Sequence, residues 1–551
     1  MELTRRDVLA AFLGAPFAAL ACRERVSSAL PPGALVGASH EVGHRLRGGA
    51  LPQPSRWETH EIVIAGGGVA GLAAAWRLAH AGIRDVVLFE LEPVVGGTAR
   101  SGPSFPWGAH YLVAPSPQNR ALTRLLGEMG VMEGASWSGG LQSTGLSREV
   151  SPVPHGLSGG SSRVPPRLAA RSSRVPGGLK STAPLEAGPL PAGAQIAEQF
   201  LCRDPQERLF YRGRWYEGLY LHAGASHEDL RQLRAFEAEI ARWTTWRDAQ
   251  GRRAFEIPMA YGSDDAEVTA LDRMSMQTWM NAHGFTSPRL RWLVEYATRD
   301  DYGSLLDDTS AWAGVFYFAS REDRPVVTWP EGNGRPVAHL ARFAPARTGW
   351  LVSSLTPVDG GVDVVAIRGE EAVGVHAKRV IFAGPQFVAS RVIPSREASP
   401  EFTYGSWMVA NLTLHDRPQS QGFPLSWDNV LYESPSLGYV VSTHQQGLDR
   451  GPTVLTYYYA LCGHDVRGER ERLLSAGRDA WAEVALADLT RAHPELRGLT
   501  ERIDVMRWGH AMIRPRPGFV RSEARRRAAE PHRGIHFANT DLSGVALFEE
   551  A

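Results

Sequence analysis

The sequence predicts an α/β protein in which a Rossmann-like dinucleotide-binding domain is interleaved with an α+β domain made of a sheet and helices. Residues 62–65 (IVIA) form an apolar run typical of a buried parallel strand, and the glycine-rich turn 66–71 (GGGVAG) follows directly. An Ala/Leu-rich helix and a second apolar strand, 86–89, complete a βαβ unit. At 551 residues, the chain is too long for one core and suits two domains.

The glycines of this turn have separate mechanical roles. Gly66 makes the tight turn, Gly68 lets backbone N–H groups approach a pyrophosphate, and Gly71 lets the helix pack closely on the strand. The phosphates then lie at a helix N-terminus. Glu90 ends the second strand, where a carboxylate accepts hydrogen bonds from an adenosine ribose and disfavours a 2′-phosphate.

Three segments resemble those of the FAD-binding amine oxidase and phytoene desaturase superfamily. Residues 90–100 (ELEPVVGGTAR) match its glycine pair and arginine after the ribose-binding acid, and residues 107–111 (WGAHY) match the segment beside the flavin. Residues 534–545 (GIHFANTDLSGV) resemble the final segment, where a strand delivers an acid to the ribityl-phosphate region and a helix N-terminus faces the flavin. The resemblance covers most of residues 58–138 and 200–551, and it implies that the cofactor is FAD.

The turn and the resemblance together give a set of expected cofactor-binding residues. They are Gly66, Gly68, Val69, Ala70, Gly71, Glu90, Gly96, Gly97, Thr98, Arg100, Gly108, Ala109, His110, Val352, Ala383, Asp541, Gly544 and Val545. Val352 is the candidate for backbone contact with adenine, with Val358 as the alternative. The chain ends at Ala551, a turn or two into the expected final helix, so this part of the domain reads as truncated.

The order of segments along the chain follows from these matches. We expect a signal peptide at 1–22, a flexible leader at 23–56, FAD-domain parts at 57–135, 346–400 and 506–551, a low-complexity insertion at 136–196, and substrate-domain parts at 197–345 (mainly helical) and 401–505 (sheet and helix). Aromatic residues of the last part could line an apolar pocket for a small-molecule substrate: Trp407, Trp427, Tyr432, Tyr457, Tyr458 and Tyr459. Strand alternation places Tyr458 on the face opposite Tyr457 and Tyr459.

The resemblance implies an FAD-dependent oxidoreductase that transfers hydride from a C–H bond of an apolar or amine substrate to flavin N5. His110, Asp301 and Trp508 are the catalytic candidates. Flavin amine oxidases usually hold a lysine near the flavin, and neither Lys180 nor Lys378 matches that position, which favours a desaturase-like or dehydrogenase reaction. A redox-neutral flavin-dependent isomerase and a degenerate flavin-binding scaffold are the alternatives.

The N-terminus predicts export. Arg5 and Arg6 precede an apolar run to Ala21, a twin-arginine (Tat) pattern read by the Tat export machinery of bacteria, and Cys22 allows a lipid anchor. We therefore expect a periplasmic or exported protein with oxygen or a quinone as electron acceptor. The 59 basic and 59 acidic residues balance, so bulk charge gives no indication of a nucleic-acid partner, and no metal-ligand cluster is evident.

Overall fold

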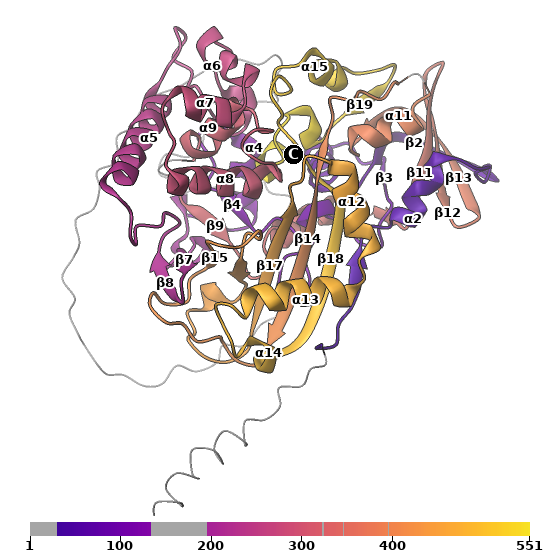
Figure 1. Cartoon of the computed structure of the whole chain (residues 1–551). Coiled ribbons are helices and arrows are strands. Elements are labelled where there is room, and N and C mark those ends of the chain that lie inside the picture. The colour runs from indigo at the N-terminus through magenta and orange to yellow at the C-terminus, as the bar shows by residue number, and fades with distance from the viewer. Residues whose placement is uncertain (1–29, 134–194, 322–323, 345, 395) are drawn as a thin grey trace, which may run out of the picture.

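A computed structural model describes residues 30–133, 195–321, 324–344, 346–394 and 396–551. The expected signal peptide, Cys22 and residues 136–194 of the expected insertion lie outside the described residues. The last two residues of that insertion, Gln195–Ile196, form β6 and pair with β5 (Met132–Glu133). Figure 1 shows a nucleotide-binding sheet, a second and mostly antiparallel sheet, and a helical layer meeting near the C-terminus.

The nucleotide-binding sheet has seven strands in the order β10-β3-β2-β13-β12-β11, with β19 paired to β13. Their bounds are β2 Arg56–Ala65, β3 Val86–Glu90, β10 Ala346–Thr348, β11 Leu351–Val358, β12 Gly361–Arg368, β13 Glu371–Phe382 and β19 Ile535–Phe537. Strands β10, β3, β2, β13 and β19 are parallel, whereas β11, β12 and β13 form an antiparallel meander. Three distant parts of the chain thus build one sheet, which confirms the predicted α/β class.

Helix α3 (Val69–His80) packs on this sheet directly after β2. Its buried residues Leu72, Ala75, Trp76 and Ala79 recur at helical spacing and form one apolar face. A Cβ atom on Gly71 would lie 1.9 Å from the carbonyl oxygen of Gly66, so only glycine allows this close approach. The helix therefore begins at the carboxyl end of β2, where the sequence places a phosphate-binding turn.

The second sheet has eight strands in the order β1-β18-β14-β17-β16-β15-β7-β8. Their bounds are β1 Leu35–Gly37, β7 Glu207–Tyr211, β8 Arg214–Glu217, β14 Tyr404–Leu414, β15 Asp428–Leu431, β16 Tyr439–Val441, β17 Thr453–Leu461 and β18 Thr500–Ile513. Helix α13 (Arg478–Leu489) packs on one face, where Tyr457 joins its core, and Tyr458 lies in the core of the opposite face. The predicted alternation of these tyrosines is confirmed.

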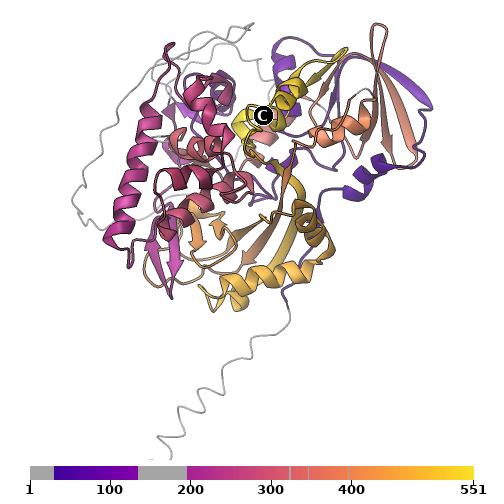
Figure 2. The same cartoon turned by 45° about the horizontal axis from the view of Figure 1, so that its top comes forward.

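A helical layer lies beside the two sheets (Figure 2). It contains α5 His227–Thr245, α6 Ala266–Ala270, α7 Met276–Ala282, α8 Pro288–Tyr302 and α9 Ala311–Ala319, which share one apolar core. Ser226 starts α5 with a reciprocal capping box to Asp229. The other helices surround the two sheets: α4 Arg120–Glu128, α10 Gly334–Leu340, α11 Gln386–Val392, α12 Val466–Ser475, α14 Leu496–Leu499 and α15 Glu523–Ala529.

The expectation of a flexible leader is wrong for residues 30–56. Strand β1 pairs in parallel with the edge of β18, and α2 (His40–His44) and the 3₁₀ turn η1 (Arg45–Arg47) follow it. Ile503 donates its backbone N–H to the carbonyl of Pro32 at 2.9 Å. Gly33 makes this approach possible, since a Cβ there would meet the Ile503 oxygen at 1.7 Å. Backbone pairing needs few apolar side chains, so composition alone could not reveal it.

Candidate functional site

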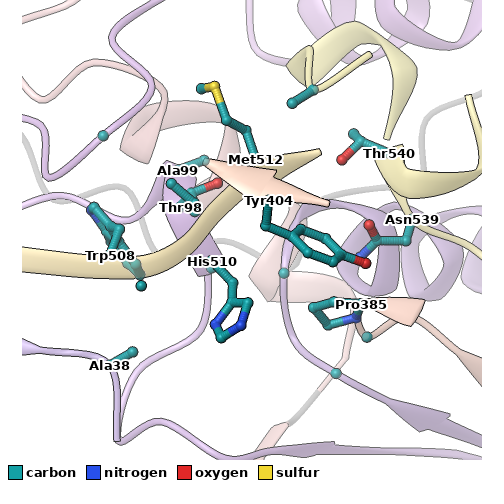
Figure 3. Close-up of a pocket in the computed structure, with 18 of the residues that line it drawn as sticks. Ala38, Thr98, Ala99, Pro385, Tyr404, Trp508, His510, Met512, Asn539 and Thr540 are labelled. Atoms are coloured by element: carbon teal, nitrogen blue, oxygen red, sulfur yellow. The ribbon is translucent and has the colours of Figure 1, made fainter. Parts of the chain in front are cut away.

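One cavity of about 930 Å³ runs between the nucleotide-binding sheet and the second sheet. Figure 3 shows part of its wall, where Tyr404, His510 and Pro385 lie together, with Trp508 and Thr98 nearby. Most of the expected site residues line it: Gly66, Gly68, Val69, Ala70, Glu90, Gly96, Gly97, Thr98, Gly108, Ala109, His110, Asp301, Val352, Ala383, Trp508 and Asp541. Four do not: Gly71, Arg100, Gly544 and Val545.

The turn before α3 has the geometry that a dinucleotide requires. Gly66 adopts a φ of +112°, which L side chains rarely reach. A Cβ on Gly68 would meet no atom within 4 Å, so it faces open space, and Gly68 is the N-cap of α3. Backbone N–H groups at this helix start are available for a diphosphate. The residues present therefore fit the diphosphate of FAD, and Gly71 acts by packing alone.

Glu90 lies at the carboxyl end of β3 and is 8 % exposed. Its carboxylate accepts hydrogen bonds from the backbone N–H groups of Gly67 at 2.6 Å and Glu92 at 2.7 Å. Burial raises the pKa of Glu90, and the two N–H donors oppose that shift. Val352 lines the cavity on β11, an edge strand of the same sheet, whereas Val358 is 40 % exposed and lies outside the cavity lining.

Arg100 does not line the cavity as expected. Its guanidinium forms a salt bridge with Glu92 at 3.0 Å, donates to the carbonyl of Gly37 at 3.3 Å, and stacks over the Trp508 ring at 4.9 Å. Glu92 also accepts from the backbone N–H of Ser39 at 2.6 Å. The arginine therefore holds the N-terminal segment, because the part-buried carboxylate of Glu92 binds both its guanidinium and Ser39.

The last cofactor segment places one acid in the cavity. Asp541 accepts hydrogen bonds through one oxygen from the Tyr404 hydroxyl at 2.6 Å and the Gln386 backbone N–H at 2.8 Å. Burial raises the pKa of Asp541 to about 6, while these two donors oppose the shift. Neither Tyr404 nor Gln386 was singled out from the sequence, because both lie more than a hundred residues away along the chain and carry no motif.

The expected final helix is absent among the described residues at this end of the chain. Two 3₁₀ turns, Thr540–Leu542 and Phe548–Glu550, stand in its place. Between them Gly544 adopts a φ of +85°, which turns the chain, and Val545 packs into the core of the helical layer. Gly544 and Val545 do not line the cavity, and their turn and core packing account for their positions; that they bind the cofactor stays a prediction.

His110 lies at the opposite end of the cavity, among aromatic rings. Its ring centroid is 4.9 Å from Tyr458, 5.4 Å from Trp427 and 5.1 Å from Tyr111. Burial lowers the pKa of His110 to about 4, so the ring is neutral at pH 7. The Tyr458 hydroxyl donates to the carbonyl of Gly108 at 2.9 Å, which fixes the glycine segment against the second sheet.

Of the six aromatic residues expected to line the pocket, Trp407 and Tyr458 do so. The other four lie outside its lining: Trp427, Tyr432, Tyr457 and Tyr459. The Trp427 ring packs against the His110 ring. Tyr457 and Tyr459 face the α13 side of the sheet. The indole N–H of Trp508 donates to the carbonyl of Trp107 at 2.6 Å. Trp508 is thus a fixed wall of the cavity.

Two adjacent carboxylates also lie at this end, in the last turn of α8. Asp301 forms a salt bridge with Arg321 at 2.5 Å, and both side chains are nearly buried. Asp300 lines the same cavity and has no salt bridge or hydrogen bond to its side chain among the described residues. Burial, and then the charge of Asp301, raise the pKa of Asp300, while Arg321 opposes the shift. Sequence reasoning missed Arg321, which carries no local motif.

Two classes of feature are absent from the described part of the chain. There, no group of three or more His, Cys, Asp or Glu residues is arranged to hold a metal ion. Within the same residues, no helix combines the length and apolar character needed to cross a membrane.

A dinucleotide-binding sheet that shares one cavity with an aromatic, carboxylate-bearing chamber defines a flavoprotein oxidoreductase. The family model for flavin containing amine oxidoreductases matches residues 69–547. The chain therefore belongs to this family and is an FAD-dependent oxidoreductase.

Solved structures share the fold. A triple mutant of putrescine oxidase superimposes with a TM-score of 0.56 at 14% identity, covering 90% of this chain and 96% of that chain. Cyclohexylamine oxidase from Brevibacterium oxydans IH-35A gives 0.55 at 13% identity, and a CLA-producing fatty acid isomerase from P. acnes gives 0.55 at 14%, each covering 89% of this chain and 96% of the other. No curated protein matches the chain. At such identities the likeness concerns the fold alone.

Proposed function

We propose that the protein is an exported oxidoreductase that removes hydride from the C–H bond next to an amine nitrogen, with apolar substrates as the alternative class. The observation that carries the proposal is Asp300, a carboxylate facing the cavity without an ion-pair partner while its neighbour Asp301 is paired with Arg321. An ammonium group supplies the missing counter-charge. FAD supplies the hydride acceptor when bound at the nucleotide end of the cavity.

The charge around Asp300 supports a cationic substrate. Asp428 and Glu207 act on Asp300 from the second sheet, and Asp301 does so from its own helix. Arg321 is the nearby cation that opposes them most strongly. The Tyr296 hydroxyl donates a hydrogen bond to Asp428 at 2.9 Å and so fixes the orientation of this carboxyl group. Arg299 opposes the acidic groups as well, and the four carboxyl groups outnumber these two cations, so this end of the cavity favours a positive ligand.

The aromatic walls define what the rest of the substrate can be. Trp407, Tyr458 and Trp508 line the cavity with large apolar surfaces, and neutral His110 adds no charge. Such walls suit an apolar carbon skeleton and exclude water from the C–H bond that reacts. Asp300 binds and orients the nitrogen and can hold its proton. Lys378 is exposed on β13, where its Nζ lies 3.7 Å from a carboxylate oxygen of Glu61. It therefore forms a surface ion pair and does not line the cavity.

Anaerobic mixing of the purified holoprotein with a substrate panel tests the proposal. The panel contains primary and secondary amines, matched alcohols, polyenes and unsaturated fatty acids, and the visible flavin absorption is followed. We expect amines to bleach the flavin, and Asp300→Asn to slow bleaching by amines. Bleaching by polyenes or alcohols alone would favour the apolar class, and product without net bleaching would favour an isomerase. No bleaching by any member would overturn the proposal.

The proposal of export depends on the twin-arginine pattern. The proposed electron acceptors, oxygen or a quinone, depend in turn on the exported location that this pattern implies. A fusion of residues 1–56 to a reporter that is active only after folded export tests the first point, with Arg5 and Arg6 changed to Lys as the matched control. We expect export that the double variant abolishes. Metabolic labelling with a fatty acid, compared with Cys22→Ala, tests the lipid anchor. Reoxidation of the reduced protein by oxygen and by a soluble quinone identifies the acceptor.

A further inference from the structure

An N-terminal strap, residues 37–47, forms one wall of the cofactor cavity. Its lining residues are Gly37, Ala38, Ser39, His40, Gly43, His44, Leu46 and Arg47. Figure 3 draws Ala38 of the strap on the same cavity as Trp508 and His510. Neither the nucleotide-binding motif nor the superfamily resemblance includes this segment, which precedes the first strand of the nucleotide-binding sheet.

The strap is attached at both ends and along its middle. Ser39 donates to Glu92 through its backbone N–H at 2.6 Å and its hydroxyl at 3.2 Å, and Arg100 binds the same carboxylate. Leu46 packs beside Leu351 in a cluster that also includes Leu91, the residue after Glu90. The strap is therefore held beside Leu91 and Glu92, which directly follow Glu90, and its position depends on side chains of the FAD-binding domain.

The strap brings uncompensated positive charge to the cavity. Arg47 and Arg391 line the cavity, are exposed, and form no hydrogen bond or ion pair among the described residues. Arg470 lines it too and donates to the carbonyls of Gly509 and Tyr404 at 2.7 and 3.4 Å. Burial, and then the charges of Arg470, Arg47 and His44, together lower the pKa of His510 to about 3. Burial, and then the charge of Arg47, also lower the pKa of Arg470, so the two guanidinium groups repel each other, and an anion held by both would relieve that repulsion.

The acidic residues nearby do not relieve this repulsion. Glu92 is engaged by Arg100 and Ser39, and Glu471 on α12 pairs with Arg467 at 2.9 Å. Glu90 is oriented by two backbone N–H groups. The strongest anion that the family cofactor offers is its diphosphate, which carries two negative charges. Arg100, the arginine expected near the cofactor, is turned away from the cavity.

We propose that the strap completes the FAD site and that Arg47, together with Arg470 of α12, binds the cofactor diphosphate. The N-terminus of α3 and the two arginines line the same cavity, so together they would supply the N–H donors and the positive charge that a diphosphate requires. The strap thereby makes cofactor retention depend on the segment that follows the predicted signal peptide. This inference rests on the family cofactor and is independent of the substrate.

Release of FAD from the full-length holoprotein tests this assignment, followed by the rise in flavin fluorescence at low and at high salt. We expect Arg47→Ala and Arg470→Gln to release FAD roughly fivefold faster at low salt, with a smaller difference at high salt because salt screens the charge. Arg45→Ala is the matched control. Arg45 lies in the same 3₁₀ turn but binds the carbonyl of Gly369 and the exposed Glu370, so its release rate should stay within about twofold.

A second measurement separates charge from packing. The FAD-free full-length variants are titrated with ADP and with adenosine, and circular dichroism checks that each variant is folded. The proposal expects Arg47→Ala to weaken ADP binding and to leave adenosine binding unchanged. Equal weakening of both ligands, or an acceleration of FAD release that salt does not reduce, would assign Arg47 a packing role and overturn the proposal. Unchanged release in both variants would overturn it as well.

Discussion

Replacing Asp541 by asparagine should stabilise the FAD-free protein at neutral and alkaline pH. The pKa of Asp541 is raised from 3.8 to about 6, with burial as the main cause. A carboxyl group whose folded pKa exceeds its unfolded value binds more protons in the folded state, so ionisation destabilises the fold as pH rises between these two values. Asparagine cannot ionise, and its amide oxygen can still accept from the Tyr404 hydroxyl and the Gln386 N–H.

The expected size follows from the shift. A shift of about two pKa units corresponds to roughly 3 kcal/mol at about 1.4 kcal/mol per unit, which is an upper value. The gain in unfolding free energy should be near zero around pH 3, roughly half of its maximum near pH 5, and constant above about pH 7. Urea unfolding midpoints of the FAD-free wild type and variant, measured at several pH values in this range, check both the sign and the shape.

Asp85→Asn is the matched control for the opposite sign. Asp85 is exposed, and hydrogen bonds from His60 and from the backbone of Glu61 lower its pKa. Its replacement should give no stabilisation at any pH. A variant at Asp541 that is destabilised at pH 8, or whose gain does not grow with pH, would show that the carboxylate is stabilising in the folded protein and would refute the reasoning.

Three further predictions concern the cavity. Gly71→Ala should destabilise the FAD-free protein, measured by thermal unfolding, because the Cβ of the new alanine would meet the Gly66 oxygen at 1.9 Å. Gly68→Ala should fold normally and weaken FAD binding, measured by FAD titration. Arg321→Met should cost about 3–5 kcal/mol of unfolding free energy by leaving Asp301 buried and unpaired. Arg231→Met, at an exposed pair, is the matched control and should leave the unfolding free energy nearly unchanged. Tetramethylammonium, whose charge is independent of pH, should bind the wild type more tightly as pH rises through the raised pKa of Asp300, and Asp300→Asn should bind it weakly at every pH.

Each of these predictions has a contradicting outcome. Equal stability of the two glycine variants would mean that the turn relaxes without cost. A mild effect of Arg321→Met would mean that Asp301 is protonated or hydrated. An ammonium affinity that falls with rising pH, or that Asp300→Asn leaves unchanged, would remove Asp300 from the substrate site.

The cofactor end of the protein could be predicted because its parts are contiguous in the chain. A strand, a glycine turn and a helix within residues 56–80 form one unit whose local geometry fixes where the phosphates lie. Glu90 then follows at the end of the next strand. These features depend on backbone conformation and short-range packing, which residue type determines directly.

Tertiary structure decided the direction of individual side chains and the pairing of distant segments. Arg100 lies within the matched segment, yet Glu92 and the strap draw its guanidinium out of the cavity. Likewise, Arg321 and Asp301 are 20 residues apart and meet only when α8 and α9 pack together. The composition of residues 30–47 suggested flexibility, but the open edge of β18 supplies hydrogen bonds that no local pattern encodes.

The sequence by itself therefore determined the fold class, the family resemblance and the dinucleotide-binding turn. The folded chain alone decided which acid remains without a counter-ion, which arginines face the cofactor cavity and which segment covers it. The physical reason is that backbone geometry follows from neighbouring residues, whereas burial and charge pairing depend on whatever groups the fold brings into contact.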